Sequence, residues 1–477
     1  MGQNNSYFRH TKIVATLGPA TDSPEILEKM ILSGVDLIRL NMAHATPEWV
    51  NQRVQRIRDA SRKVGRQVAV MMDVKGPEIR TAKIPEPIEL IPGERFEFVT
   101  EWAVPSGNKG VSVNYPNLPE DVEAGKEILV DSGLIRLKVV TIHKDRVVCE
   151  VVIGGSLGSK RHINLPGVLI KLPALTKKDE VDLAGGVEAG IDFVALSFVR
   201  QASDIEELRA YLKSLGSKAR IIAKIEDQAG VRNLEAIIKA TDGVMVARGD
   251  LGIEIAYHEL PLVQRQIVEC CRVEGKPVII ATHLLESMID SPIPTRAEIS
   301  DVSNAIREQA DAVMLSGETT TGQYPLEAID VLNNIIDTIE PTVPNRINKD
   351  IILHQPKSKM LRSATYLAQE LGEESGIVVF TRSGFLGYVL GAMRARGVRI
   401  FAFTDDEVVF RQLLFPWGVE PFLMNLNEVD PEDTILNSLE VLKDRGWVKI
   451  GETLVVITNV LAGESTIVDT LQLRLIE

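Results

Sequence analysis

Residues 221–254, IIAKIEDQAGVRNLEAIIKATDGVMVARGDLGIE, contain two short apolar segments that each end in polar or charged residues. Lys224 and Glu226 close the first segment, and Arg248, Gly249 and Asp250 close the second. Side chains two apart on a strand face the same side, so Lys224 and Glu226 are predicted to project together, with Asp250 beside them. Such a group suits Mg²⁺ and an anionic substrate. An ordinary salt bridge at a strand end is the alternative, because most charged residues are solvated.

Outward from this stretch, short apolar segments alternate with helical patterns. The predicted strands are 12–18, 35–42, 67–74, 192–198, 219–226, 243–249, 276–283 and 312–317. Helix start signals occur at 22–25, 46–48 and 294–298, where Ser, Thr or Asp precedes an early Glu and Pro lies close by. Strands this rich in Val, Ile, Ala and Met indicate a parallel sheet covered on both faces. The pattern predicts a closed (β/α)₈ TIM barrel, with an open doubly wound sheet as the other architecture.

Residues 77–171 interrupt the alternation. Segments such as FEFVT, VSVNY and RVVCEVVIGG are rich in β-formers and separated by turn residues, so we expect a small inserted β-barrel domain. The insertion follows the carboxyl end of the third strand, where it could close over the barrel mouth as a lid. A purely structural insertion is the alternative.

A third domain is predicted after a polar, proline-containing linker near residue 344. The expected organisation is a barrel from 1–76 and 172–343, a β-barrel lid domain at 77–171 and an α/β allosteric domain at 344–477. In the last domain a strand runs into Thr381, Arg382, Ser383 and Gly384 and then into a helix. Hydroxyls, a guanidinium and free amides at a helix start can cradle a phosphate, although the same residues also make ordinary turns.

Composition narrows the class of protein. The chain has 477 residues, 45% of them hydrophobic and 25% charged, which is typical of a globular protein of about three domains. The 66 acidic residues outnumber the 53 Lys and Arg and give a net charge of −13. This balance argues against nucleic acid or an anionic membrane as the partner.

The sequence also predicts a cytoplasmic protein. The first residues, MGQNNSYFRHTK, contain no long apolar segment, and no run of about 18 apolar residues occurs in the chain. The three cysteines, at 149, 270 and 271, do not form a disulfide framework or a zinc-binding spacing. We expect them to be structural thiols.

Polar side chains recur at the same end of the other predicted strands. They are Arg39, Asn41 and His44 at the end of the second strand, Asp73 and Arg80 at the end of the third, and Thr282 and His283 at the end of the seventh. In a barrel these groups converge on one cavity, which favours a functional reading of Lys224, Glu226 and Asp250. The two arginines have the fork geometry that phosphate binding needs. The histidines are as often packing residues, and Asn and Asp also cap turns.

Eight motifs, in order, resemble those of pyruvate kinase. They are TKIVATLGPAT, RLNMAHA, MDVKGPEIR, KIED, VMVARGDLGIE, ATHLLESM, PTRAEISDVSNA and MLSGETTTGQYP. The layout of barrel, lid and carboxyl-terminal domain is also similar to that family, so the resemblance covers nearly all of the chain. It implies transfer of the phosphoryl group of phosphoenolpyruvate to ADP, giving pyruvate and ATP as the final step of glycolysis.

The resemblance assigns roles to the residues of the opening stretch. It implies that Glu226 and Asp250 hold Mg²⁺ or Mn²⁺ and that Lys224 and Arg39 surround the moving phosphoryl group. Backbone amides near Gly249 and Asp250 would hold the substrate carboxylate at a helix start. These roles agree with phosphoryl transfer, which depends mainly on positioning and charge neutralisation.

Other matches concern the enolate and the nucleotide. Thr282 matches the family threonine near the enolate carbon and is expected to act in a water relay, because a hydroxyl alone is a poor acid at neutral pH. His44, Arg80 and Arg161 match nucleotide-side positions. Arg161 and His162 stand where the family usually has Lys and Gly, which keeps the charge but changes its geometry.

The resemblance also implies K⁺ dependence. Asn41, Asp73 and the backbone carbonyl of Val74 match the K⁺ ligands, and Glu78 is the residue that accompanies K⁺ dependence in the family. The usual RLNFSHG reads RLNMAHA here, so Ala43 replaces a serine that joins the site. One hydroxyl ligand is therefore missing.

At the effector loop, Phe385 and Leu386 replace the more familiar Arg-Ser or Arg-Thr. A phosphorylated allosteric activator is therefore expected, and a sugar monophosphate or AMP is favoured over fructose 1,6-bisphosphate. Family members form homotetramers, with the helix that opens at 294–298 near a subunit boundary, so a homotetramer is expected by analogy.

Two other functions compete with the kinase. A Mg²⁺-dependent lyase that works through a pyruvate enolate could use the same carboxylates, although Arg80, Arg161 and the lid argue against it. A catalytically silent metabolite sensor would explain the separate phosphate loop. The intact Lys224, Glu226, Asp250 and Thr282 argue against the sensor.

Overall fold

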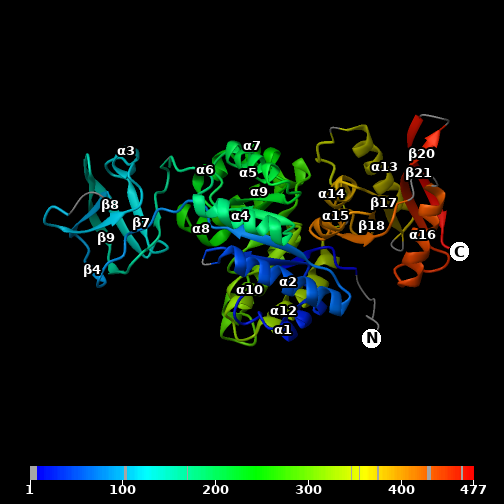
Figure 1. Cartoon of the computed structure of the whole chain (residues 1–477), viewed down its shortest axis with the longest axis horizontal. Coiled ribbons are helices and arrows are strands. Elements are labelled where there is room, and N and C mark those ends of the chain that lie inside the picture. The colour runs from blue at the N-terminus through cyan, green and yellow to red at the C-terminus, as the bar shows by residue number, and fades with distance from the viewer. Residues whose placement is uncertain are drawn as a thin grey trace.

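Three bodies follow one another along the long axis of the protein (Figure 1), with the inserted β domain at one end, a helix-covered barrel in the middle and the C-terminal sheet at the other end. The structure is a computed structural model. It describes residues 8–477 apart from 44, 101–104, 169, 345, 354, 373–374, 427–430 and 463–465.

Eight parallel strands close into the central barrel. In chain order they are β1 (Lys12–Thr16), β2 (Leu37–Asn41), β3 (Ala69–Val74), β12 (Phe193–Leu196), β13 (Arg220–Ile225), β14 (Gly243–Ala247), β15 (Val278–Ala281) and β16 (Ala312–Leu315). The ring closes because β1 pairs with β16 on one side and with β2 on the other. The predicted TIM barrel is therefore confirmed, and the open sheet is excluded. Each predicted strand is present but shorter, by one or more residues at one or both of its ends.

Helices cover the barrel on the outside. They are α1 (Pro24–Leu32), α2 (Pro47–Val64), α4 (Lys177–Ala189), α5 (Ala202–Ser214), α7 (Leu234–Ala240), α9 (Leu260–Glu274), α10 (Arg296–Arg307) and α12 (Pro325–Ile339). The predicted start signals are confirmed. Ser23 and Thr46 each cap a helix through the side-chain oxygen, and Thr295 forms a capping box with Glu298.

Short helices line the carboxyl end of the barrel. They are α6 (Gln228–Arg232), α8 (Arg248–Glu254), the 3₁₀ helix η1 (Glu286–Ile289) and α11 (Gly317–Thr320). In the structure α8 begins at Arg248, directly after β14. The prediction that the strand continues to Gly249 was wrong, since Arg248 and Gly249 already belong to the first turn of this helix.

The inserted domain leaves the barrel after β3. Its elements are β4 (Ile88–Leu90), β5 (Arg95–Thr100), β6 (Lys109–Val113), α3 (Leu118–Asp121), β7 (Glu127–Val130), β8 (Ile135–His143), β9 (Arg146–Ile153), β10 (Gly155–Leu157) and β11 (Ile163–Asn164). A six-stranded and a two-stranded sheet enclose one apolar core. The domain lies on the side of α6 and α8 (Figure 1), next to the carboxyl ends of the barrel strands.

The C-terminal domain is an α/β layer with a five-stranded sheet ordered β19-β18-β17-β20-β21. Its elements, after the 3₁₀ helix η2 (Glu340–Thr342), are α13 (Pro356–Glu370), β17 (Gly376–Phe380), α14 (Phe385–Ala392), β18 (Arg399–Thr404), α15 (Glu407–Gln412), β19 (Val419–Leu423), α16 (Pro431–Asp444), β20 (Thr453–Ala462) and β21 (Thr466–Leu475). Only β21 runs antiparallel to its neighbour. The predicted alternation of helices and strands is confirmed.

The C-terminal domain closes the amino end of the barrel. Phe415 is fully buried among the residues that fill the barrel interior, and its ring meets that of Phe193 edge-on with centroids 5.5 Å apart. Gly243 at the start of β14 leaves room for this ring, because a Cβ there would lie 2.9 Å from it. The amino end is therefore blocked, and the open end of the barrel is the one that carries the polar side chains.

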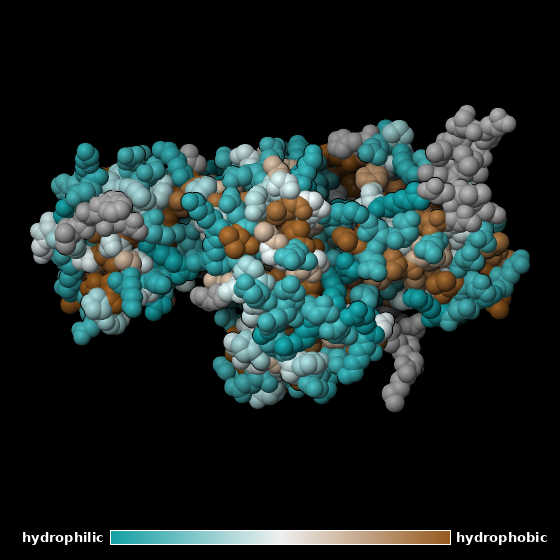
Figure 2. All heavy atoms as spheres, in the orientation of Figure 1, coloured by the Kyte–Doolittle hydropathy of each residue, from teal (hydrophilic) through white to brown (hydrophobic). Residues whose placement is uncertain are grey.

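The protein surface carries both hydrophobic and hydrophilic residues. On the face in Figure 2, hydrophobic residues occur as separate patches among hydrophilic ones. Among the described residues, no helix combines the length and apolarity needed to cross a membrane.

Candidate active site

Lys224 lies at the centre of the site. Its Nζ is 2.9 Å from Glu226 Oε1 and 3.2 Å from Asp73 Oδ1, and it donates a hydrogen bond of 2.8 Å to Ser197 Oγ. The side chain is 10% exposed. Burial opposes its charge, but Asp73 and Glu226 outweigh burial and hold the pKa of Lys224 above its ordinary value. The lysine is therefore a fixed cation at the barrel mouth.

Arg39 adds a second cation beside the first. Its Nε donates to Asp73 Oδ2 at 2.7 Å, and its Nη1 donates to Thr16 Oγ1 at 3.2 Å. Asp73 thus joins both cations, and the pKa of its buried carboxyl lies below the ordinary value because Lys224 and Arg39 more than offset the effect of burial. Two positive groups held by one carboxylate make an anion-binding surface.

Glu226 is held in place by the backbone. Its Oε2 accepts a 2.6 Å hydrogen bond from the Phe198 amide, at a residue with a positive φ of 54°. Burial raises the pKa of Glu226 to about 7, Asp250 and Asp73 add to the shift, and Lys224 opposes it. A cation beside Glu226 and Asp250 would relieve this repulsion. The donor set therefore fits a hard divalent ion.

The first turn of α8 faces the end of β15. The Gly249 amide donates to Thr282 Oγ1 at 2.8 Å, and that hydroxyl donates to the Ala281 carbonyl at 2.7 Å. Thr282 has a positive φ of 66°, an unusual conformation for a β-branched residue. Arg248 anchors this turn through Asp301, with nitrogen–oxygen distances of 2.6 and 2.8 Å. The strained geometry brings the Thr282 hydroxyl to the first turn of α8.

Ser197 was missed by the sequence reasoning. Its hydroxyl accepts from Lys224 and donates to the Val74 carbonyl at 2.8 Å, so it joins β12, β13 and β3. It follows β12 at the same end as the other polar residues. That position was the available signal, but the search concentrated on charged side chains.

The predicted K⁺ ligands lie next to one another. Asn41 and Asp73 are paired across β2 and β3, and Val74 follows in β3. Asn41 Oδ1 accepts from the Ala43 amide at 3.1 Å, while the Val74 carbonyl accepts from Ser197. The oxygen donors are therefore adjacent at one edge of the mouth. They are the kind of ligands a hard cation prefers.

The predicted nucleotide residues lie on the lid side. Arg80 donates to Glu78 at 2.7 Å and pairs across a β-bridge with His162, and Arg161 Nη1 lies 3.1 Å from Asp131 Oδ1. The two guanidiniums thus come from adjacent segments. His44 lies outside the described residues, and His283 is exposed at the edge of the mouth.

The loop predicted to bind a phosphorylated effector is far from this mouth, at the start of α14. Gly384 has a positive φ of 78°, the Phe385 amide donates to Ser383 Oγ at 3.4 Å, and Arg382 lies 3.4 Å from Asp405. Thr381 is tied to the sheet through its backbone amide, which donates to the Phe403 carbonyl. The loop thus presents a hydroxyl and a guanidinium at a helix start.

Metal binding at the mouth would depend on two carboxylates. Within the part of the chain that the structure describes, no group of three or more His, Cys, Asp or Glu side chains is arranged to hold a metal ion. Glu226 and Asp250 would leave most positions of a divalent ion to water or substrate. That pattern is usual for Mg²⁺ at phosphate-binding sites.

Comparisons with known proteins all point to one family. The family profile described as "Pyruvate kinase, barrel domain" matches residues 8–329, and the one described as "Pyruvate kinase, alpha/beta domain" matches residues 358–473. Plastidial pyruvate kinase 2 of Arabidopsis thaliana is 41% identical over 94% of this chain and 78% of its own. The pyruvate kinase of Geobacillus stearothermophilus is 40% identical over 96% of this chain and 78% of its own.

A solved structure shows the same architecture. A pyruvate kinase from Cryptosporidium parvum superposes with a TM-score of 0.90 at 31% sequence identity. The alignment covers 98% of this chain and 96% of that one, so all three bodies have counterparts.

Proposed function

Because the chain belongs to the pyruvate kinase family, we propose that it transfers the phosphoryl group of phosphoenolpyruvate to ADP, giving pyruvate and ATP. The observation that supports this most is the buried Lys224, held charged between Asp73 and Glu226 at the barrel mouth. A fixed cation aimed at developing negative charge is what phosphoryl transfer requires.

In the proposed reaction, an oxygen of the ADP β-phosphate attacks the phosphorus, and the bond from phosphorus to the enolate oxygen breaks. The bonding electrons stay on the substrate as an enolate. Lys224 and Arg39 neutralise the phosphoryl group in transit, and Lys224 then stabilises the enolate oxygen. A proton reaches the enolate carbon through water held near Thr282, and pyruvate results.

Glu226 and Asp250 would hold Mg²⁺ or Mn²⁺. When bound, the ion neutralises charge on the phosphate and carboxylate of the substrate. The Gly249 amide, now bonded to Thr282, lies in the first turn of α8, where backbone N–H groups favour a carboxylate. Binding of the substrate carboxylate there would place the enol oxygen toward Lys224.

The lid side would bind the nucleotide. Arg80 and Arg161 supply cations for the phosphates of ADP, with His44 as the third expected contact. The boundaries of the lid at 77–171 and of the C-terminal domain at 344–477 stay predictions, as does closure of the lid over the site.

Three further properties belong to the proposal. K⁺ would bind at Asn41, Asp73 and the Val74 carbonyl, more weakly than in relatives because Ala43 lacks the hydroxyl. A phosphorylated metabolite would bind at 381–384 and activate the enzyme. The active form would be a cytoplasmic homotetramer, which light scattering of the purified protein would test.

A coupled assay tests the function. The purified protein with phosphoenolpyruvate, ADP, Mg²⁺ and K⁺ should form pyruvate and ATP in equal amounts. A pyruvate-enolate lyase would release pyruvate from a larger carbon substrate without forming ATP. A silent sensor would bind metabolites with no turnover, so absence of both products would refute the kinase.

A further inference from the structure

A polar contact joins the lid to the barrel outside the catalytic cluster. Asn164 ends β11, which pairs with β7 in the lid sheet, and Glu254 is the last residue of α8. Asn164 Nδ2 donates to Glu254 Oε1 at 2.9 Å. The two residues are 4% and 8% exposed, so the bond is shielded from water. A buried hydrogen bond to a carboxylate is costly to break on one side only.

The carbonyl oxygen of the Asn164 side chain accepts no hydrogen bond from the described residues. This atom, Oδ1, is also buried. A carboxylate can only accept, whereas a protonated carboxyl can also donate. A proton on Glu254 would therefore let the planar acid and amide groups form two parallel hydrogen bonds.

The surroundings of Glu254 favour such a proton. Burial raises its pKa to about 7, Asp227 and Asp250 add to the shift, and Asn164 and Arg232 oppose it. A cavity of about 40 Å³ adjoins the pair and is also lined by His162 and Arg200. These are the charged and titratable groups that face Glu254 from the lid, from α6, from α8 and from the segment after β12.

Helix α8 connects this contact to the active site. It has only seven residues, with Gly249 and Asp250 in its first turn and Glu254 at its end. Its end is held by Asn164 from the lid and by Gln228, whose Nε2 donates to the Glu254 carbonyl at 2.5 Å. A displacement of the lid at Asn164 therefore acts on the helix that carries Asp250.

We infer that Asn164 and Glu254 are a positioning pair that couples the lid to α8 and so sets the placement of Gly249 and Asp250 for substrate and divalent cation. This inference rests on the proposed function of the same site. It concerns two residues that are not among the proposed ligands of the substrate or the ion.

An exchange of the acid and the amide tests the pair. Asn164→Asp keeps the side-chain volume but opposes two carboxyl groups, so it should weaken Mn²⁺ binding and lower kcat/KM for phosphoenolpyruvate by about tenfold each. Adding Glu254→Gln restores one acid and one amide in exchanged positions. The double variant should return both quantities to within about threefold of the unmodified protein. Mn²⁺ binding is measured by titration calorimetry without substrates.

The lid offers a matched control. Asn108 Nδ2 donates to Glu97 Oε1 at 2.7 Å, the same chemical pair but inside the lid. Asn108→Asp should leave the Mn²⁺ affinity within about twofold, because that pair does not reach the barrel. Thermal unfolding of each variant checks that the fold is retained.

The coupling is supported if the double variant recovers Mn²⁺ binding and kcat/KM while Asn108→Asp leaves the Mn²⁺ affinity unchanged. The inference is overturned if Asn164→Asp binds Mn²⁺ and turns over normally, if the exchange fails to rescue, or if Asn108→Asp weakens Mn²⁺ binding equally. Because Mn²⁺ binding needs no turnover, the comparison stays valid even if the kinase assay fails.

Discussion

The charge on Lys224 depends on its neighbours rather than on solvent. A lone buried lysine tends to lose its proton, because burial penalises the charged form. Here Asp73 and Glu226 lie within 3.2 and 2.9 Å of the ammonium and keep it protonated. The cation is thus in place before any substrate arrives, and no reorganisation is needed as negative charge develops.

Replacing this lysine tests its role. Lys224→Met keeps the approximate length and apolar volume but removes the charge, so phosphoryl transfer should fall by about 10³-fold or more while the fold persists. Steady-state rates and circular dichroism measure the two effects. Lys218→Met is the control, since Lys218 is exposed and its ammonium pairs with Asp406 at the other end of the barrel. Near-normal turnover of Lys224→Met would refute the role.

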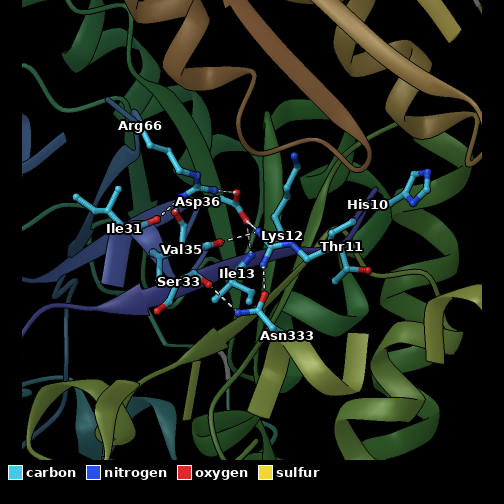
Figure 3. A network of polar contacts seen from close by, with 12 residues as sticks. His10, Thr11, Lys12, Ile13, Ile31, Ser33, Val35, Asp36, Arg66 and Asn333 are labelled. Carbon is cyan, nitrogen blue, oxygen red and sulfur yellow. Dashed lines mark hydrogen bonds and ion pairs between the residues drawn. The ribbon is translucent and has the colours of Figure 1, made fainter. Parts of the chain in front are cut away.

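At the scale of elements, the amino ends of β1 and β2 are tied together beneath the site. Asp36, just before β2, accepts from Arg9 at 2.6 Å, from Arg66 at 2.8 Å and from the Ile13 amide at 2.8 Å. Figure 3 shows Asp36 and Arg66 meeting beside Lys12 of β1. Burial would raise the pKa of Asp36, but Arg9, Lys12 and Arg66 outweigh burial and lower it. The network holds the barrel at the end opposite to the polar mouth.

Removing this charge should destabilise the barrel. Asp36→Asn leaves two arginines without their carboxylate, so the free energy of unfolding should fall by about 3–5 kcal/mol. Urea denaturation measures the change. Asp59→Asn, which breaks an exposed ion pair with Arg62, is the matched control and should cost less than about 1 kcal/mol.

The lowered pKa of Asp36 also predicts how the stability difference between the unmodified protein and Asp36→Asn depends on pH. The stability that Asp36 adds is present above the ordinary aspartate pKa of 3.8 and is lost as the pH falls through the lower value of the folded protein. The difference in free energy of unfolding between the unmodified protein and Asp36→Asn should persist at neutral pH and decrease only below pH 3.8. A stability difference that disappears already near neutral pH would contradict a lowered pKa for Asp36.

At the scale of the whole molecule, the C-terminal domain contacts barrel strand β13. Arg220 begins β13, and its Nη2 donates to the Ser383 carbonyl at 2.7 Å while its guanidinium lies 4.0 Å from the Tyr388 ring centre. The same strand carries Lys224 near its other end. The predicted effector loop is thus in direct contact with the strand that holds Lys224.

The effector loop can be tested by its response to phosphorylated ligands. The double change Arg382→Ala and Ser383→Ala removes a cation and a hydroxyl from the predicted phosphate cradle, so the activation ratio with AMP, ribose 5-phosphate or glucose 6-phosphate should fall to about one. Steady-state rates measured with and without each ligand give the activation ratio. Ser363→Ala, on α13 of the same domain, should respond as the unmodified enzyme does. Persistent activation of the double variant would exclude this loop.

Much of the fold could be predicted from local pattern. Each barrel strand is a short apolar run that stands out against amphipathic helices, and the β-rich insertion differs in composition from both. The polar strand ends could be collected for the same reason, because parallel strands place their carboxyl ends together. Only the ends of elements were misjudged, as at Arg248, where a helix begins directly after the strand.

The sequence by itself therefore determined the order of βα units, the place of the insertion and the residues Lys224, Glu226 and Asp250, since these follow from residue type and spacing. The tertiary structure decided that the strands close into a ring, that Ser197 bridges Lys224 to β3, and that Asn164 of the lid holds Glu254. These contacts join residues far apart in the chain. They depend on strand register and on the packing of the lid against the barrel, which local periodicity does not encode.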